Sequence, residues 1–341
     1  MNNRLRNISS RKYGYGFSLI ELMVALVIGM LVTLVISQTL SVYEGRKRTT
    51  SGTADAQTSG SLALYALQRD AEMAGFAMPN IAFNDTNALS NPNYSALKCN
   101  TTTNYTENTP IAVNTFPVTI VSGVDSDVIT IRYGNSPFGG IPTSLLANFA
   151  GNIANVDNTL GCKPGDSVLI IPSSSLDCLM TKIPTFAENG NNEPIATNTI
   201  ALTINSAPPT VTIPAKLFCL GAWNESVFSI SSNKLLRNGE PVGNDIIAIK
   251  AQYGISGSAT DNKIVDWVDG TFTDKNRIKS IRVALLARNN LYEKDIVTND
   301  KPTYFGGSQF NLSGDWGHYR YRVFETIVPL RNVVWSREAI Q

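Results

Sequence analysis

Cysteine and histidine are the side chains of this sequence best suited to covalent or metal chemistry. The chain has four cysteines, Cys99, Cys162, Cys178 and Cys219, and one histidine, His318, among its 341 residues. A zinc site needs several thiolates or imidazoles at short spacing, and no two of these cysteines form a Cys-x-x-Cys pair. A serine or cysteine triad needs a histidine beside its nucleophile. The sequence therefore predicts no metal, no cofactor and no enzymatic activity.

Two disulfides are the better interpretation of the four cysteines, and three connectivities are open. Disulfides persist in oxidising compartments, so this interpretation places the cysteine-bearing part of the chain outside the cytoplasm. The alternative is four buried free thiols, since cysteine is among the most frequently buried residues.

One carboxylate lies inside an otherwise apolar segment near the N-terminus. Residues 17–37 are apolar apart from Glu21 and a few hydroxyls. As a helix this segment of about 21 residues would extend ~31 Å, which spans the hydrocarbon core of a bilayer. An unpaired charge at that depth costs at least ~2.5 kcal/mol, so Glu21 needs a partner.

Cleavage of the chain after Gly16 would create that partner. A new α-amino group on Phe17 would lie four residues before Glu21, and it could pair with the carboxylate of the same or a neighbouring subunit. An ordinary secretory signal has its small-residue cleavage site after the apolar stretch, whereas Gly16 precedes it. The remaining alternative is an uncleaved signal anchor in which Glu21 lies near the interface.

Basic residues flank the apolar segment on both sides. Four precede it and three follow it: Arg4, Arg6, Arg11, Lys12, and then Arg46, Lys47, Arg48. Loss of residues 1–16 would change the formal charge from +1 to −3, because the four basic residues leave with them. The positive-inside rule and the cysteines together predict a single span whose large C-terminal part faces outward. No basic and aromatic stretch of the kind that binds nucleic acid is present.

The run Gly16-Phe17-Ser18-Leu19-Ile20-Glu21 resembles the cleavage and methylation motif of type IV prepilins. The resemblance implies that a membrane prepilin peptidase cuts between Gly16 and Phe17 and methylates the new amine of Phe17. It also implies that Glu21 pairs with that amine during filament assembly.

A helix is expected to continue beyond the membrane segment. Leu64, Leu67, Ala71 and Ala74 recur at spacings of three and four, which places them on one helical face. Glycines at 45, 52 and 60 weaken the helix in between, so fraying is expected there. We divide the chain into four parts: a leader (1–16), a transmembrane or filament-core helix (17–40), its amphipathic continuation (41–78) and a β-rich domain (79–341).

Strand patterns fill the rest of the chain. They occur at 117–121, 128–133, 167–171, 199–204, 217–220, 227–230, 246–253, 278–287 and 319–328. The Asn- and Thr-rich stretch 80–115 is expected to be a long surface loop. One long helix followed by strands predicts an α+β, pilin-like fold in which an antiparallel sheet domain packs against the helix.

Several of these strands resemble the PilW family of minor pilins. The resemblance rests on the order of four short motifs, residues 165–170, 245–254, 281–288 and 329–332. It implies a minor pilin that helps to assemble a type IV pilus in its priming or tip complex. The implied partners are the prepilin peptidase, other minor pilins, the major pilin and the inner-membrane assembly platform. The subunit would lie in the inner membrane with its C-terminal part in the periplasm, and on the pilus after assembly.

Two other functions stay open from the sequence. A pseudopilin of a type II secretion system would share the N-terminus, and a pilus-associated adhesin or DNA-uptake subunit would bind ligands through loops such as 80–115. Clustered aspartates at 125–127 and 261–274 could hold calcium, but turns favour Asp and Gly in any case. Arginines at 282, 288, 320, 322 and 331 could form a basic face for an acidic partner.

Overall fold

A computed structural model describes the chain over most of its length. The described residues are 16, 18–82, 93–95, 99, 101–138, 140–149, 151–172, 177–185, 194–206, 210–259 and 261–338. By its internal contacts the chain divides into two units, Met1–Gly52 and Thr53–Gln341. The predicted α+β class is confirmed, because one long helix is followed by sheets, and no second helix of comparable length occurs in the described ranges.

Helix α1 spans Leu19–Met73 and has 55 residues. The fraying predicted between Gly45 and Gly60 is not found, since the whole stretch is helical. Hydroxyl groups there bond back to the helix: Thr58 Oγ1 donates to the carbonyl oxygen four residues earlier, at 3.0 Å. Such bonds satisfy a polar side chain without water, at a small cost in helix propensity.

The helix ends at a glycine in the left-handed region. Gly75 has a φ of +75° and lies just past the last helical residue, where glycine commonly caps a helix. Its N–H donates to the carbonyl of Arg132 at 2.9 Å. The amide of Asn332 donates to the carbonyl of Ala74 at 3.1 Å. These bonds fix where α1 stops, because they satisfy polar groups that the helix leaves unpaired.

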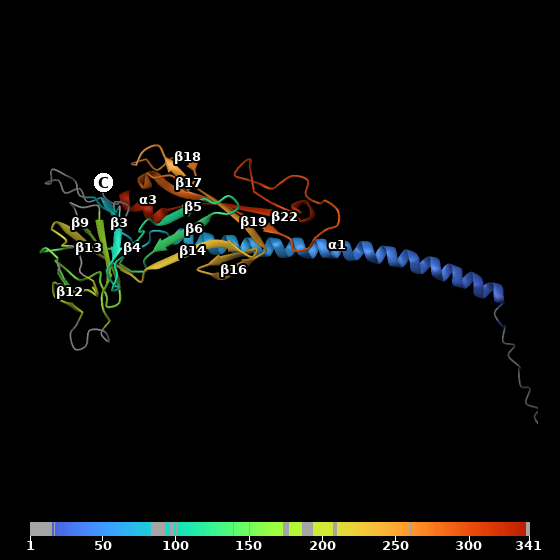
Figure 1. Cartoon of the computed structure of the whole chain (residues 1–341), viewed down its shortest axis with the longest axis horizontal. Coiled ribbons are helices and arrows are strands. Elements are labelled where there is room, and N and C mark those ends of the chain that lie inside the picture. Colours follow the sequence, from blue (N-terminus) through green and yellow to red (C-terminus); the bar gives the residue numbers. More distant parts are fainter. Residues whose placement is uncertain are drawn as a thin grey trace, which may run out of the picture. The chain divides into compact units, whose positions relative to one another are not determined.

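Within the second unit, α1 buries one stripe of mostly small side chains. Leu67, Ala71 and Ala74 are fully buried and Leu64 is partly buried, which confirms the amphipathic helix predicted from these positions. Two alanines extend the stripe toward the N-terminus: Ala56 and Ala63. Small side chains at these spacings let the neighbouring strands lie close to the helix axis (Figure 1).

Gly60 is the position of closest approach on this stripe. A Cβ atom at Gly60 would lie 2.1 Å from the ring of Phe324. We expect Gly60→Leu to lower the free energy of unfolding of the second unit by about 1–3 kcal/mol, because the ring must move. Gly45→Leu is the matched control, since nothing lies within 4 Å of that position and it also replaces a helical glycine. Equal denaturant midpoints for the two variants would contradict this packing.

Five antiparallel strands form the sheet next to the helix stripe, in the order β16-β15-β14-β6-β5. They are β5 (Val118–Val121), β6 (Val128–Tyr133), β14 (Asn224–Ser231), β15 (Lys234–Arg237) and β16 (Glu240–Asn244). Ile129, Ile131 and Phe228 are fully buried and belong to the same core as the α1 stripe. Apolar side chains at alternating positions thus place one face of this sheet on the helix.

A second antiparallel sheet has the order β18-β17-β19-β22. Its strands are β17 (Ile246–Ser256), β18 (Ile264–Val268), β19 (Ile278–Arg288) and β22 (Tyr321–Pro329). Strands β17 and β19 are largely buried on both faces: one face joins the α1 core, and Ala248, Ala284 and Leu286 on the other face pack on Phe310. Continuous apolar runs are expected of strands covered on both sides.

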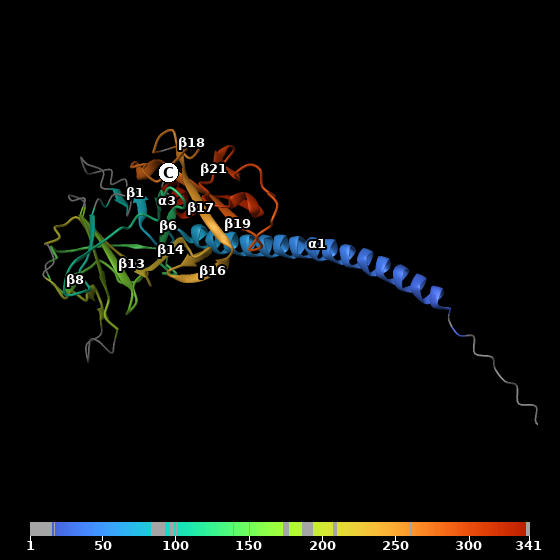
Figure 2. The same ribbon diagram turned by 45° about the vertical axis from the view of Figure 1, so that its right-hand side comes forward.

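A third group of strands forms its own core within the second unit (Figure 2). A six-stranded sheet has the order β4-β3-β10-β9-β13-β7, and a three-stranded sheet has the order β11-β12-β8. The strands are β3 (Thr101–Asn104), β4 (Ile111–Val113), β7 (Pro142–Ser144), β8 (Ile153–Asn155), β9 (Ser167–Pro172), β10 (Asp177–Lys182), β11 (Ile195–Ala196), β12 (Thr199–Ala201) and β13 (Ala215–Gly221). We call this group the β subdomain.

The prediction of a long loop before the β subdomain was wrong. Residues 80–115 were predicted as a surface loop, yet β3 and β4 belong to the six-stranded sheet. Strand β3 pairs in parallel with β10, the one parallel pair among the described strands. The remaining small elements are β1 (Asn80–Ala82), β2 (Asn93–Ser95), η2 (Lys275–Arg277), β20 (Thr303–Tyr304), β21 (Ser308–Gln309), η3 (Trp316–His318) and α3 (Arg331–Glu338).

Candidate functional site: the N-terminal processing and assembly segment

Gly16 lies three residues before Leu19, the first residue of α1, and it is exposed. Apart from its chain neighbours, no described residue has an atom within 4 Å of the position that a Cβ would take there. Phe17, the predicted second half of the cleavage site, lies outside the described residues. The described residues next to the predicted cleavage point are Gly16 and Ser18, and both are exposed to solvent.

Ser18 and Glu21 form a reciprocal cap at the start of α1. The hydroxyl of Ser18 accepts a hydrogen bond from the Ile20 N–H at 3.2 Å, and the Ser18 N–H donates to Glu21 Oε2 at 3.0 Å. A serine followed three residues later by a glutamate is the capping-box pattern, which satisfies amide donors at a helix start. The positive end of the helix dipole also favours a carboxylate in the first turn. Ser18 is not among the site residues predicted from the sequence, although its spacing from Glu21 is the signal for this cap.

The first part of α1 exposes a large apolar surface. Every described side chain from Ser18 to Lys47 is exposed. The helix includes an 18-residue window with a mean hydropathy of 2.8 and no buried residue. Apolar surface of this extent needs a bilayer or other apolar helices to cover it. By length and composition this helix can cross a membrane.

The four cysteines pair as two disulfides in the β subdomain. Cys99 pairs with Cys178 and Cys162 with Cys219, which selects one of the three connectivities. The first bond fastens the residues before β3 to β10, and the second fastens the segment before β9 to β13. No free cysteine occurs among the described residues.

The other candidate residues have structural partners. His318 Nδ1 lies 2.8 Å from the carbonyl oxygen of Glu293, and its ring stacks on Tyr292 at 4.8 Å between centroids. Asp127 pairs with Lys250 at 3.1 Å and also accepts from the N–H of Ala251. No cluster of three metal-ligating side chains occurs in the part of the chain that the structure describes.

Two of the arginines proposed for a basic face are engaged within the fold. Arg282 lies between the rings of Trp267 and Phe305, at 4.7 and 4.3 Å from their centroids. Its pKa is lowered by burial. Arg320 forms an ion pair with Glu293 at 2.6 Å. Guanidinium groups held in this way contribute packing rather than a free positive surface.

Tyr253 has a strongly shifted pKa, and its role is also structural. Burial raises the pKa of Tyr253 to about 12, because desolvation opposes the phenolate. Its hydroxyl donates to the carbonyl of Val118 at 3.2 Å and accepts from the N–H of Ile120 at 2.7 Å. A tyrosine satisfied by two backbone groups of β5 anchors β17 to that strand and offers no proton for chemistry.

Comparisons with known proteins match both ends of the chain. Residues 11–37 match the prokaryotic N-terminal methylation motif, and residues 222–332 match the family described as Type IV Pilus-assembly protein W. No relative was found among curated proteins. A type IV-like pilin from Thermus thermophilus is similar at a TM-score of 0.27 and 12% identity, covering 63% of this chain and 82% of that chain. With a TM-score this low, the similarity supports no conclusion about the fold or function of this chain.

The chain has a pilin-like α+β architecture, in which a segment that matches the methylation motif leads into one long apolar helix and a domain of mostly antiparallel strands follows. Within that class, the match over residues 222–332 confirms the resemblance to the PilW family. The matched region includes β14–β19 and β22, so the family resemblance covers the strands that pack on α1 except β5 and β6.

Proposed function

We propose that the chain is a minor pilin, processed by prepilin peptidase and required for the assembly of a type IV pilus. The observation that carries this proposal is the capped glutamate in the first turn of an exposed, apolar helix. Such a helix can move from lipid to a filament core, since both environments cover apolar surface. The β domain would then stand outside the core and contact other subunits.

Cleavage between Gly16 and Phe17 would free an α-amine one residue before Ser18. Glu21 Oε2 already lies 3.0 Å from the Ser18 N–H, and consecutive Cα atoms are only about 3.8 Å apart. The charged amine and the carboxylate would therefore come within reach of each other, in one subunit or between neighbours. This pairing would remove the cost of carrying an isolated carboxylate into an apolar environment.

The proposed division of the chain follows from this processing. Residues 1–16 form the removed leader, 17–40 the transmembrane and later filament-core helix, 41–78 its continuation, and 79–341 the extracytoplasmic domain. Two disulfides in that last part support an oxidising compartment, which in this setting is the periplasm. The proposed partners are the prepilin peptidase, other minor pilins, the major pilin and the inner-membrane assembly platform.

Deletion of the gene tests the minor pilin role. We expect surface pili to be largely lost while the major pilin accumulates in the membrane, because assembly lacks one of its initiating subunits. The measurement is the amount of major pilin in sheared and membrane fractions, with the complemented strain as control. Normal piliation with a defect in protein secretion would instead identify a type II secretion pseudopilin. Normal piliation with a defect only in adhesion or DNA uptake would restrict the chain to a binding role.

A further inference from the structure

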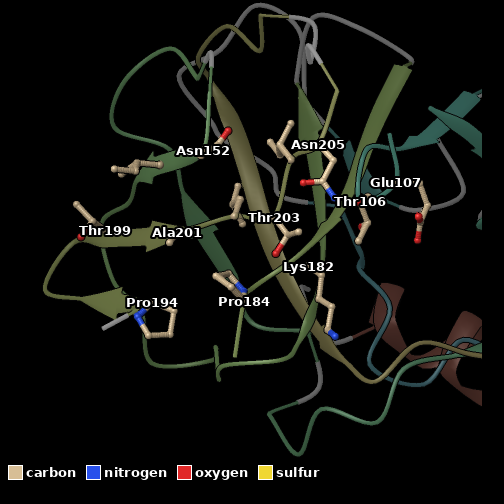
Figure 3. Close-up of a pocket in the computed structure, with 13 residues that line it drawn as sticks. Thr106, Glu107, Asn152, Lys182, Pro184, Pro194, Thr199, Ala201, Thr203 and Asn205 are labelled. Atoms are coloured by element: carbon tan, nitrogen blue, oxygen red, sulfur yellow. Dashed lines mark hydrogen bonds between the residues drawn. The ribbon is translucent and has the colours of Figure 1, made fainter. Parts of the chain in front are cut away.

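A cleft of about 730 Å³ lies in the β subdomain, far along the chain from the processing segment (Figure 3). Its lining includes Leu202, Thr203, Ile204 and Asn205, which follow β12, together with residues of three other segments. Strands β8 and β12 contribute Ile153, Thr199 and Ala201, the end of β10 contributes Lys182, and the loop after β3 contributes Thr106. This volume falls within the roughly 300–1,000 Å³ typical of small-ligand sites.

The chemistry of the lining is that of hydroxyl and amide groups. Seven of the thirteen lining residues are polar, and five of those are threonine or asparagine. Such side chains both donate and accept hydrogen bonds. No aromatic ring lines the cleft among the described residues, so a nucleobase would find no stacking surface. An apolar ligand would leave these polar groups unpaired.

Thr203 has a hydroxyl group that the fold leaves unpaired. Its N–H donates to the Lys182 carbonyl at 2.7 Å, and its carbonyl accepts from Thr181 Oγ1 at 2.6 Å. Its own Oγ1 is buried and has no hydrogen-bond partner among the described residues. A buried hydroxyl without a partner costs about 1–3 kcal/mol. Rotation of the Thr203 side chain toward the cleft, where its hydroxyl would meet a ligand hydroxyl, would therefore be favoured.

Lys182 adds one positive charge to the lining. In the described part of the chain, no carboxylate lies within 4.0 Å of its amine. One cation is too few for a polyphosphate or a nucleic-acid backbone, which proteins bind through several. Glu107 adds one negative charge to the same lining, so the lining has no net charge. A neutral ligand would match it, as would a ligand with a single acidic group beside Lys182 and away from Glu107.

We propose that this cleft binds a saccharide, neutral or with one acidic group placed near Lys182. Sugar hydroxyls both donate and accept, as the threonine and asparagine side chains of the lining do. The flat apolar surfaces of Pro184 and Pro194 would contact the carbon face of the ring. The proposal adds a binding activity to the subunit and does not depend on its role in pilus assembly.

The test uses the full chain in detergent micelles and a panel of defined saccharides: hexoses, N-acetylhexosamines, uronic acids and sialic acids. We expect binding to at least one member, measured by calorimetry. Thr203→Val should weaken it about tenfold or more, since the lost hydrogen bond is replaced by an unpaired sugar hydroxyl. Lys182→Gln should weaken the binding of acidic sugars more than the binding of neutral sugars. Thr210→Val and Lys263→Gln, which change exposed residues outside the cleft, are the matched controls.

Two kinds of result would overturn the proposal. One is the absence of binding across the panel down to a Kd of ~1 mM, with a chain that unfolds cooperatively and retains both disulfides. The other is saccharide binding that the Thr203 and Lys182 variants leave unchanged, because the site would then lie elsewhere. If only peptides or single-stranded DNA bound, and the cleft variants reduced that binding, the cleft would be functional but the ligand class wrong.

Discussion

Replacing Glu21 with alanine or glutamine is expected to leave cleavage intact and to remove most of the subunit from filaments. Both substitutions remove the negative charge, so the amine of Phe17 loses its proposed partner. Both also make the apolar helix easier to keep in the membrane, since a buried carboxylate costs at least ~2.5 kcal/mol. Loss of incorporation therefore cannot result from poor membrane insertion.

The two substitutions separate the charge of Glu21 from its capping role. Glutamine can still accept the hydrogen bond from the Ser18 N–H, whereas alanine cannot. If pairing with the amine matters most, both variants should be almost absent from sheared filaments. If only the cap matters, glutamine should behave as the natural residue. Glu44→Gln, a change to an exposed carboxylate on the same helix, is the control. Normal incorporation of Glu21→Ala would contradict the assembly role.

Loss of the two disulfides is expected to cause the largest change in stability. They close loops with sequence separations of 79 and 57 residues. By chain entropy, loops of that size contribute about 4 kcal/mol each, although the measured effect is often smaller. Such a loss is comparable to the whole stability of many domains, about 5–15 kcal/mol.

The variants Cys99→Ser with Cys178→Ser, and Cys162→Ser with Cys219→Ser, test the two bonds separately. Each should lower the denaturant midpoint of the second unit, and the combined variant should unfold readily at 37 °C. Treatment of the natural chain with a reductant should reproduce the combined result. A mixed pair, Cys99→Ser with Cys162→Ser, breaks both bonds and should therefore lower the midpoint about as far as the combined variant, which tests the connectivity. Unchanged midpoints in every variant would contradict the pairing.

The parts of the fold that could be predicted are those with a local pattern. β6 and β9 contain consecutive Val, Ile and Leu residues, and their predicted and observed bounds nearly coincide. The amphipathic stripe of α1 repeats at helical spacing, so Leu67 and Ala71 were assigned correctly. The capping box at Ser18 is equally local, because its signal is a serine followed three residues later by Glu21.

The parts that could not be predicted depend on distant residues. The segment Thr101–Asn104 is polar, and its composition is typical of a loop. In the structure Thr102 is buried, and its hydroxyl lies 3.3 Å from that of Thr115. Its strand is held between β4 and β10, and the bond from Cys99 to Cys178 fastens it there. Disulfide connectivity has no local signal. Four cysteines allow three pairings, and the residues around each cysteine do not select one of them. The cleft likewise combines residues from 106 to 205 along the chain.

The central claim is that the mature subunit begins at Phe17. Mass spectrometry of the N-terminal peptide, after expression of the chain with and without a prepilin peptidase, tests it most directly. A peptide that begins with methylated Phe17, found only when the peptidase is present, is the result that the prepilin assignment predicts. An uncut chain that begins at Met1 in both samples, or a cut beyond Ser37, would contradict it.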